Sequence, residues 1–96
     1  EGFVSKDTYV VIIVQPFSNA QAGTEIENQA KKRAFTSLLK YKHAQGKILS
    51  QNGTTQLVNV INECGTLTKI DDAEQKRSVY QFVVKKDNLK QFVDGL

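Results

Sequence analysis

The sequence has no methionine and no tryptophan, and only one cysteine, one histidine and one proline among its 96 residues. The single cysteine, Cys64, excludes an internal disulfide and a zinc site built from cysteines alone. The single histidine, His43, excludes sites that need paired histidines. Because the chain opens at Glu1, we expect that processing removed an upstream segment, namely a secretion signal, a lipid anchor or another domain.

Long apolar runs are also missing. The longest is Tyr9 to Val14, which has the length of a strand and falls far short of the roughly 18 apolar residues that suggest a membrane span. We therefore expect no transmembrane segment in this chain. A length of 96 residues predicts one domain covering residues 1–96. Its polar first segment, residues 1–7, is expected to be a flexible lead-in.

Charge of one sign is not concentrated anywhere. Thirteen Lys and Arg residues stand against ten Asp and Glu residues, which gives a net charge of +3. Nucleic-acid-binding domains usually gather their cations on one face. Lys31, Lys32 and Arg33 are consecutive, so on a helix they point in different directions, and no aromatic platform accompanies them. A mildly basic, solvated surface is the favoured interpretation.

The first structured segment is a strand over residues 8–14. It is β-branched almost throughout and apolar at both alternating sets of positions. A strand with one buried face alternates with polar residues, so this pattern predicts a central strand covered on both sides. Pro16 has no amide hydrogen to donate, which predicts the end of the strand.

A long helix follows the polar segment 18–23. Thr24 and Glu27 have the spacing of a capping box, and Gly46 suits a left-handed stop after about Gln45. At 100° per residue, one apolar stripe runs along this helix. Its members are Ile26, Ala30, Ala34, Leu38, Tyr41 and Ala44.

The segment 47–65 allows two interpretations. Asn52-Gly53 between two apolar pairs is typical of a β-hairpin. The apolar residues from Leu57 to Cys64 have helical spacing, and Gly65 supplies a stop. We favour a short helix over about 55–64 and keep the hairpin as the alternative.

The last third of the chain reads as a hairpin and a short helix. Residues 66–70 and 78–85 form two strands around the charged turn 71–77, and Asp87 is expected to cap the last helix. The predicted fold is therefore α+β: a three-stranded, mainly antiparallel sheet packed by one long and two short helices, in the order β-α-α-β-β-α.

Residues with catalytic or ligand chemistry are few and scattered. His43 lies near the end of the long helix, where a structural or exposed role is expected. Cys64 shares the helical phase of apolar neighbours and suits a small buried hydrophobe. The acidic turn with Asp71, Asp72 and Glu74 lacks the pattern of a calcium loop. We therefore expect no enzyme, no metal and no cofactor.

A candidate interaction surface lies on the long helix. Phe35 and Leu39 fall beside the apolar stripe, and Lys31 and Lys42 separate them from it. In one interpretation the lysines snorkel while the two apolar residues pack beneath a neighbouring helix. In the other, Phe35 and Leu39 ringed by Lys31 and Lys42 face a partner protein. An exposed edge of the predicted sheet is the alternative candidate for an interaction surface.

The order of these segments resembles a bacterial envelope group that includes small surface lipoproteins and the N-terminal domain of a flagellar T-ring protein. The corresponding pieces are Tyr9–Val14, Ala30–Leu39, Gly46-Lys-Ile-Leu-Ser50 and Gly65–Val84. The chain differs from that group in having no lipid-acceptor cysteine and fewer alanines in the helix. The resemblance transfers no functional residues.

The resemblance implies an exported, non-catalytic domain of the periplasm or cell surface, a structural or protein-interaction module. Its expected partners are other envelope proteins, with a homo-oligomer as a second option and a lipid anchor upstream. The alternative is a small cytoplasmic nucleic-acid-binding domain that places its helix lysines and arginine on phosphates.

Overall fold

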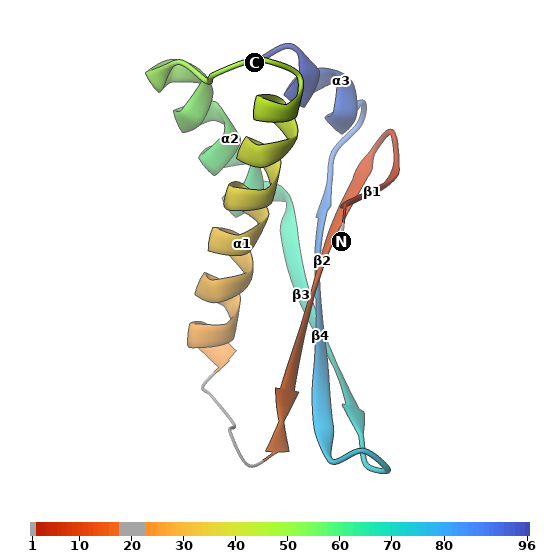
Figure 1. Ribbon diagram of the computed structural model, residues 1–96. Helices are drawn as coiled ribbons and strands as arrows, with labels where there is room; N and C mark the ends of the chain where they lie inside the picture. The colour runs from red at the N-terminus through yellow and green to blue at the C-terminus, as the bar shows by residue number, and fades with distance from the viewer. Residues whose placement is uncertain (1, 18–22) are drawn as a thin grey trace.

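The computed structural model describes residues 2–17 and 23–96, and its ribbon is drawn in Figure 1. In chain order the elements are β1 (Gly2–Ser5), β2 (Thr8–Pro16), α1 (Gly23–Ala44), α2 (Gln51–Cys64), β3 (Gly65–Asp72), β4 (Arg77–Lys85) and α3 (Leu89–Asp94). Over the described residues the fold is α+β with an antiparallel sheet and three helices, as predicted. The sheet in this part of the chain has four strands and not three, and α2 has 14 residues and begins at Gln51, so it is longer than the short helix predicted over about 55–64.

The additional strand is β1, inside the segment 1–7 that was predicted to be a flexible lead-in. It pairs with β2 in antiparallel register, with Phe3 opposite Tyr9. The Phe3 ring lies edge-on to Tyr9 at 4.9 Å and to Tyr41 at 5.3 Å between centroids. These aromatic contacts fix a strand that is too short for its own sequence pattern to indicate.

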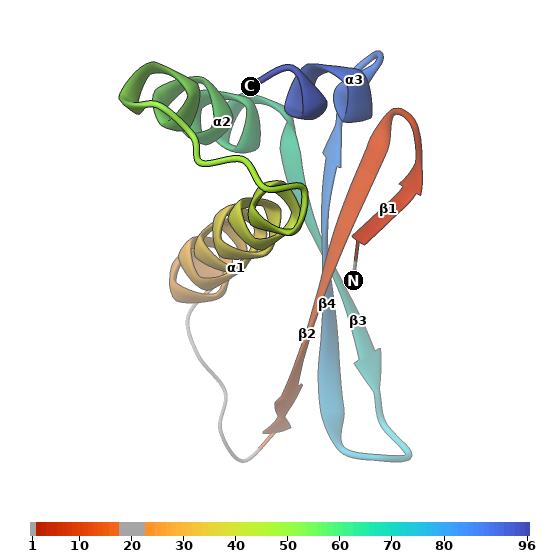
Figure 2. The same cartoon turned by 45° about the horizontal axis from the view of Figure 1, so that its top comes forward.

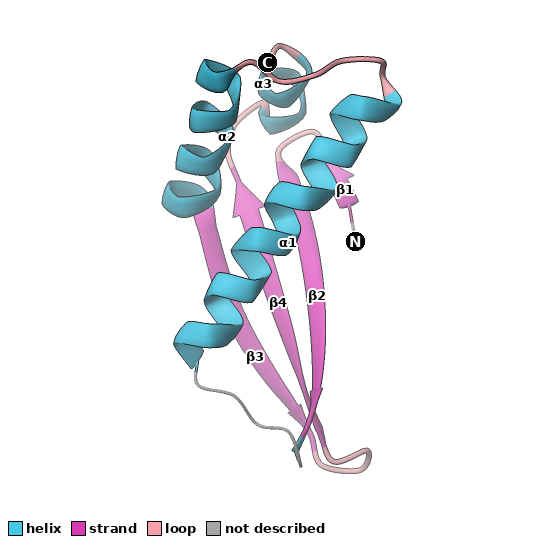
Figure 3. Cartoon of the chain, turned by 60° about the vertical axis from the view of Figure 1, so that its left-hand side comes forward, coloured by secondary structure: helices cyan, strands magenta, loops and turns pink. Residues whose placement is uncertain are grey.

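The sheet has the order β1-β2-β4-β3, so β2 is central as predicted. Both β2 and β3 are antiparallel to β4 and therefore run in the same direction as each other. The chain passes from β2 to β3 through α1 and α2, and this one crossover places both helices on the same face of the sheet (Figures 2 and 3). The short helix α3 closes the end of the same core with Leu89 and Val93.

The core lies between α1 and this covered face. Ile26, Ala30, Ala34 and Leu38 have no exposed surface, which confirms four members of the predicted stripe, whereas Tyr41 is half-buried and Ala44 exposed. The two alanines leave little side chain between the helix and the sheet, so the helix can approach it closely. The sheet contributes Tyr9, Val11, Ile13, Tyr80, Phe82 and Val84.

The other face of the sheet corrects the prediction that residues 8–14 are covered on both sides. On that face Ile12 and Val14 are 42% and 47% exposed, although Val10 is buried at 8%, while Val11 and Ile13 on the helix face are 0% and 3% exposed. The strand is apolar on two faces, but the helices of this fold cover only one of them.

Helix ends follow the sequence in part. Gly46 adopts a φ of 74°, which confirms the left-handed stop. α1 begins at Gly23, so Thr24 lies in the first turn and is not the cap. α2 is a helix, so the hairpin alternative at Asn52-Gly53 is wrong: Ser50 caps α2 by accepting a 3.0 Å hydrogen bond from the Gly53 amide.

The start of α3 corrects the predicted cap at Asp87. The N-cap is Asn88, whose φ is 55° and whose side chain makes no capping hydrogen bond. Its amide instead donates to Asp7 Oδ1 at 2.8 Å, and the Lys90 amide donates to the Lys6 carbonyl at 2.9 Å. The turn between β1 and β2 therefore supplies the partners for the first turn of α3.

Candidate interaction surfaces

The four residues predicted to form one surface do not lie on one surface. Lys42 has no exposed area, and its Nζ donates to the backbone oxygen of Asp94 at 2.9 Å. It joins α1 to α3 and cannot flank a docking site at the surface. Lys31 is half-buried and pairs with Glu27, one turn earlier on α1, at 3.2 Å.

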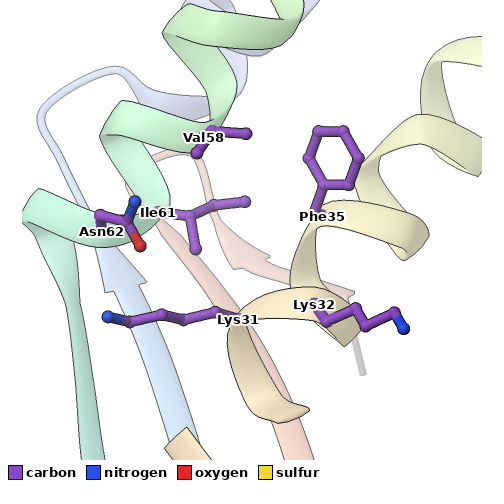
Figure 4. A pocket seen from close by; sticks show the side chains of 6 residues that line it. All are labelled: Lys31, Lys32, Phe35, Val58, Ile61 and Asn62. Atoms are coloured by element: carbon purple, nitrogen blue, oxygen red, sulfur yellow. The ribbon is translucent and has the colours of Figure 1, made fainter. Parts of the chain in front are cut away.

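Phe35 lies between α1 and α2. With Val58 and Ile61 of α2 it lines a hollow of about 200 Å³, and it packs against the core cluster. Figure 4 shows Phe35 and Val58 facing each other across this hollow, while Lys31 and Lys32 extend in different directions at its rim. This arrangement favours the interpretation in which Phe35 packs beneath a neighbouring helix.

Leu39 lies elsewhere, on the outer side of α1. It lines a separate hollow of about 400 Å³ together with Thr36, Lys40, His43 and Ala44. Every one of these residues comes from α1, so the hollow is a shallow depression along a single helix. Phe35 and Leu39 therefore contribute to two different surfaces.

The end of α1 and the end of α3 meet at Asp94. The Tyr41 hydroxyl donates to Asp94 Oδ1 at 2.7 Å, and Gln45 Nε2 donates to the same oxygen at 3.3 Å. The backbone oxygen of Asp94 accepts from both Lys42 and Lys47, at 2.9 and 3.3 Å. One residue of α3 thus holds four side chains from the last turns of α1 and the loop after it.

These contacts shift three pKa values. The hydrogen bond from Tyr41 is the main cause that lowers the pKa of Asp94, and the same bond raises the pKa of Tyr41. Burial lowers the pKa of Lys42, and the nearby charge of Lys47 lowers it further. The groups of this cluster are hydrogen-bonded to Asp94, so the cluster links α1 to α3 and has a structural role.

The candidates for catalysis or metal binding lie in separate places. His43 is at the outer side of α1, Cys64 is the last residue of α2 and packs against the core, and Asp71 is in β3. Within residues 2–17 and 23–96, no three His, Cys, Asp or Glu side chains are grouped so that they could hold a metal ion. In the same part of the chain, no helix combines the length and the apolar character that crossing a membrane requires.

The open face of the sheet is the surface that sequence reasoning missed. Strand pairing places the following side chains on it: Val10, Ile12 and Val14 from β2; Val79, Gln81 and Val83 from β4; and Thr66, Thr68 and Ile70 from β3. Ile70 is 61% exposed. One signal was available: a single crossover between parallel strands can cover only one face of a sheet.

Comparisons of this chain with protein-family models, with curated proteins and with solved structures find no match.

Proposed function

We propose that this domain is a non-catalytic protein-interaction module that binds its partner through the open face of the sheet. The observation that carries the proposal is the exposure of Ile12 and Val14 in β2 and of Ile70 in β3 on one face of the sheet. The half-buried Val79, Gln81 and Val83 of β4 lie between these two strands on the same face. Aliphatic side chains gathered on an exposed surface are typical of protein interaction sites. The polar residues Thr66, Thr68 and Gln81 on the same face can supply hydrogen bonds to a partner.

The face is better suited to a protein than to a small ligand. A small-molecule site is concave and encloses most of its ligand. The side chains of this face come from a pleated sheet that is exposed along β2 and β3 and is not enclosed by the helices, which lie on the opposite face (Figure 2). An open apolar face of a sheet is buried effectively by a second sheet or an amphipathic helix.

The second part of the proposal concerns the compartment in which this domain works. The resemblance of the sequence to bacterial envelope proteins supports a periplasmic or cell-surface domain that contacts other envelope proteins. Fractionation of cells that express the full-length gene product tests this part. We expect the protein in the periplasmic or membrane fraction, and recovery with the cytosol would contradict it.

Site-specific photo-crosslinking tests the interaction surface. A benzophenone side chain placed at Ile12 or Val14 is expected to capture a protein partner in the cells that make this domain. The matched control is the same group at Thr36, which is exposed on the outer side of α1. A second variant, Val14→Lys, is expected to abolish capture from position 12 while the melting temperature stays unchanged. Equal capture from position 36, or none from the sheet, would overturn the proposal.

The nucleic-acid alternative stays a prediction. Lys31 is ion-paired with Glu27, and Lys31 and Lys32 extend in different directions (Figure 4), so the structure adds no support for a shared phosphate site at these residues. Fluorescence anisotropy with a labelled duplex at increasing salt checks it, because phosphate contacts make affinity fall steeply with ionic strength.

A further inference from the structure

The sheet has two edges, and they differ. At one edge, β1 has four residues and an irregular register between Phe3 and Ser5. A short and irregular edge strand is poorly suited to pairing with another chain. At the other edge, β3 has eight residues in continuous register with β4 from Gly65 to Asp72. β3 is therefore the edge that can accept a further strand.

The outer half of β3 lies beyond α2. The strands of the β3–β4 hairpin continue past α2 to the far end of the molecule (Figure 3), and the residues from Thr68 to Asp71 are exposed. Backbone groups along an unpaired edge can pair with another strand. A strand that pairs here must also carry side chains that match those of this edge.

The side chains at the edge are self-complementary. Lys69 and Asp71 lie on the helix face of β3, and Ile70 between them lies on the open face. Each charged group is already held in place: Lys69 Nζ is 3.6 Å from Asp71 Oδ1 and 5.9 Å from the centre of the Tyr80 ring, and Ser78 donates to Asp71 at 2.8 Å. A positive, an apolar and a negative residue thus stand in a row at the exposed edge.

Antiparallel pairing of β3 with a second β3 restricts the register. Residues directly opposite each other share a face of the sheet, so a joint sheet with one continuous open face needs a two-fold axis centred on a residue. If the axis passes through Lys69, the lysines of the two copies lie opposite each other, and if it passes through Thr68, Lys69 lies opposite Leu67. If the axis passes through Ile70, Lys69 of each copy lies opposite Asp71 of the other, and the two Ile70 side chains lie opposite each other.

We propose that two copies of this chain associate through β3, in antiparallel register about Ile70, with two reciprocal Lys69–Asp71 pairs. The two sheets then form one sheet whose open faces are continuous and whose helices lie on the same side. Lysine on an edge strand commonly prevents pairing. Here Lys69 also meets a carboxylate of the other copy in the register about Ile70, whereas it meets a lysine or a leucine in the other two registers, so it selects the first. The inference goes beyond the proposed function, because the second copy binds at the edge of the sheet and leaves the open face free for another partner.

Sedimentation velocity of the purified protein, at concentrations up to about 1 mM, covers the range of weak complexes and tests the proposal. We expect a concentration-dependent dimer. Lys69→Asp places a second carboxylate opposite Asp71 of the other copy, and Asp71→Lys sets lysines against each other. Either change alone is therefore expected to weaken self-association at least about tenfold. Circular dichroism of each variant confirms that the monomer is folded.

Mixing the two variants gives the decisive measurement. In a mixed pair, both acidic positions of the Lys69→Asp chain face both lysines of the Asp71→Lys chain, so we expect a heterodimer where each variant alone is monomeric. The double variant K69D/D71K is expected to restore the homodimer. A wild-type monomer at every concentration, or a mixture that stays monomeric, overturns the inference. Capture of another protein from Ile12 would leave the proposed function standing in that case.

Discussion

Gly65 lies directly against the ring of Phe82 at the point where α2 turns into β3. A Cβ atom at position 65 would come within 2.8 Å of Phe82 Cε1 and 2.5 Å of the Ile61 carbonyl oxygen. The backbone of Gly65 has a φ of −83°, which any residue can adopt. Glycine is therefore required here by space and not by backbone conformation, and this close approach joins α2 to the central strand β4.

Gly65→Ala is accordingly expected to destabilise the fold by about 2–3 kcal/mol, because neither the buried ring nor the helix carbonyl can move away freely. Urea unfolding measures the free energy. Gly95→Ala is the control, since a Cβ there meets its nearest atom at 3.4 Å and φ is −82°. We expect less than about 0.5 kcal/mol for the control. Similar losses for both variants would contradict the steric argument.

The tie at Asp94 predicts a dependence on acid pH. The hydrogen bond from Tyr41 lowers the pKa of Asp94 in the folded state, so the unfolded state takes up a proton first as the pH falls. Asp94 therefore contributes stability above about pH 4, and this contribution is lost as the pH falls through the folded pKa. Asp94→Asn removes the charge but keeps an acceptor for Tyr41. Its stability is expected to fall less between pH 6 and pH 2 than that of the wild type, by about 1 kcal/mol.

Tyr41→Phe provides the control for this assignment. It removes the donor, so Asp94 is expected to lose most of the shift of its pKa, which NMR titration of the carboxyl carbon can follow. In a double-mutant cycle, the two substitutions should cost less together than the sum of each alone. Additive losses would show that the two groups act separately.

Lys42 predicts a second rise of stability with pH, on the alkaline side. Burial lowers its pKa in the folded state, so near pH 10 the unfolded state holds more protons and this group makes stability rise with pH. Lys42→Met fills the same space without a charge, and Lys47 still donates to the Asp94 oxygen. We expect the variant to stay within about 1 kcal/mol of the wild type at pH 7 and to lack the alkaline rise. Thermal melts between about pH 8 and pH 10.5 measure both.

Lys42→Ala is the matched comparison, because it removes the buried alkyl chain as well as the charge. A loss of at least about 2 kcal/mol is expected from the space that it leaves. If Lys42→Met were as damaging as Lys42→Ala, the ammonium group and not the alkyl chain would be the essential part.

Local sequence signals located most elements of this fold, and they failed where tertiary contacts decide. The long helix, its stop at Gly46 and the antiparallel hairpin follow from periodicity and from glycine, which act within a few residues. Strand β1 depends on the contacts of Phe3 with Tyr9 and Tyr41, residues that come later in the chain. No pattern within residues 1–7 reports such contacts.

The position of Lys42 could not be predicted for a related reason. Helical phase placed Lys42 at the border of the apolar stripe, where a lysine usually snorkels to water. The structure buries it because α3 brings the backbone oxygen of Asp94 to its Nζ, across 52 positions of sequence. The apolar character of both faces of β2 was read correctly from the sequence, but a sequence pattern does not tell whether a helix or a partner covers an apolar face.

Ile12 and Ile13 allow a direct test of the uncovered face, because they are neighbours of the same type on opposite sides of β2. Ile12 is 42% exposed and Ile13 is 3% exposed. Threonine is also β-branched, so each Ile→Thr change replaces the ethyl group of isoleucine with a hydroxyl and has little effect on strand propensity. Ile13→Thr is expected to cost about 2 kcal/mol or more, since it buries a hydroxyl and loses packing. Ile12→Thr is expected to cost less than about 0.5 kcal/mol. Equal losses in urea unfolding of the dilute monomer would mean that Ile12 is buried in solution, and the open face would then not exist in the monomer.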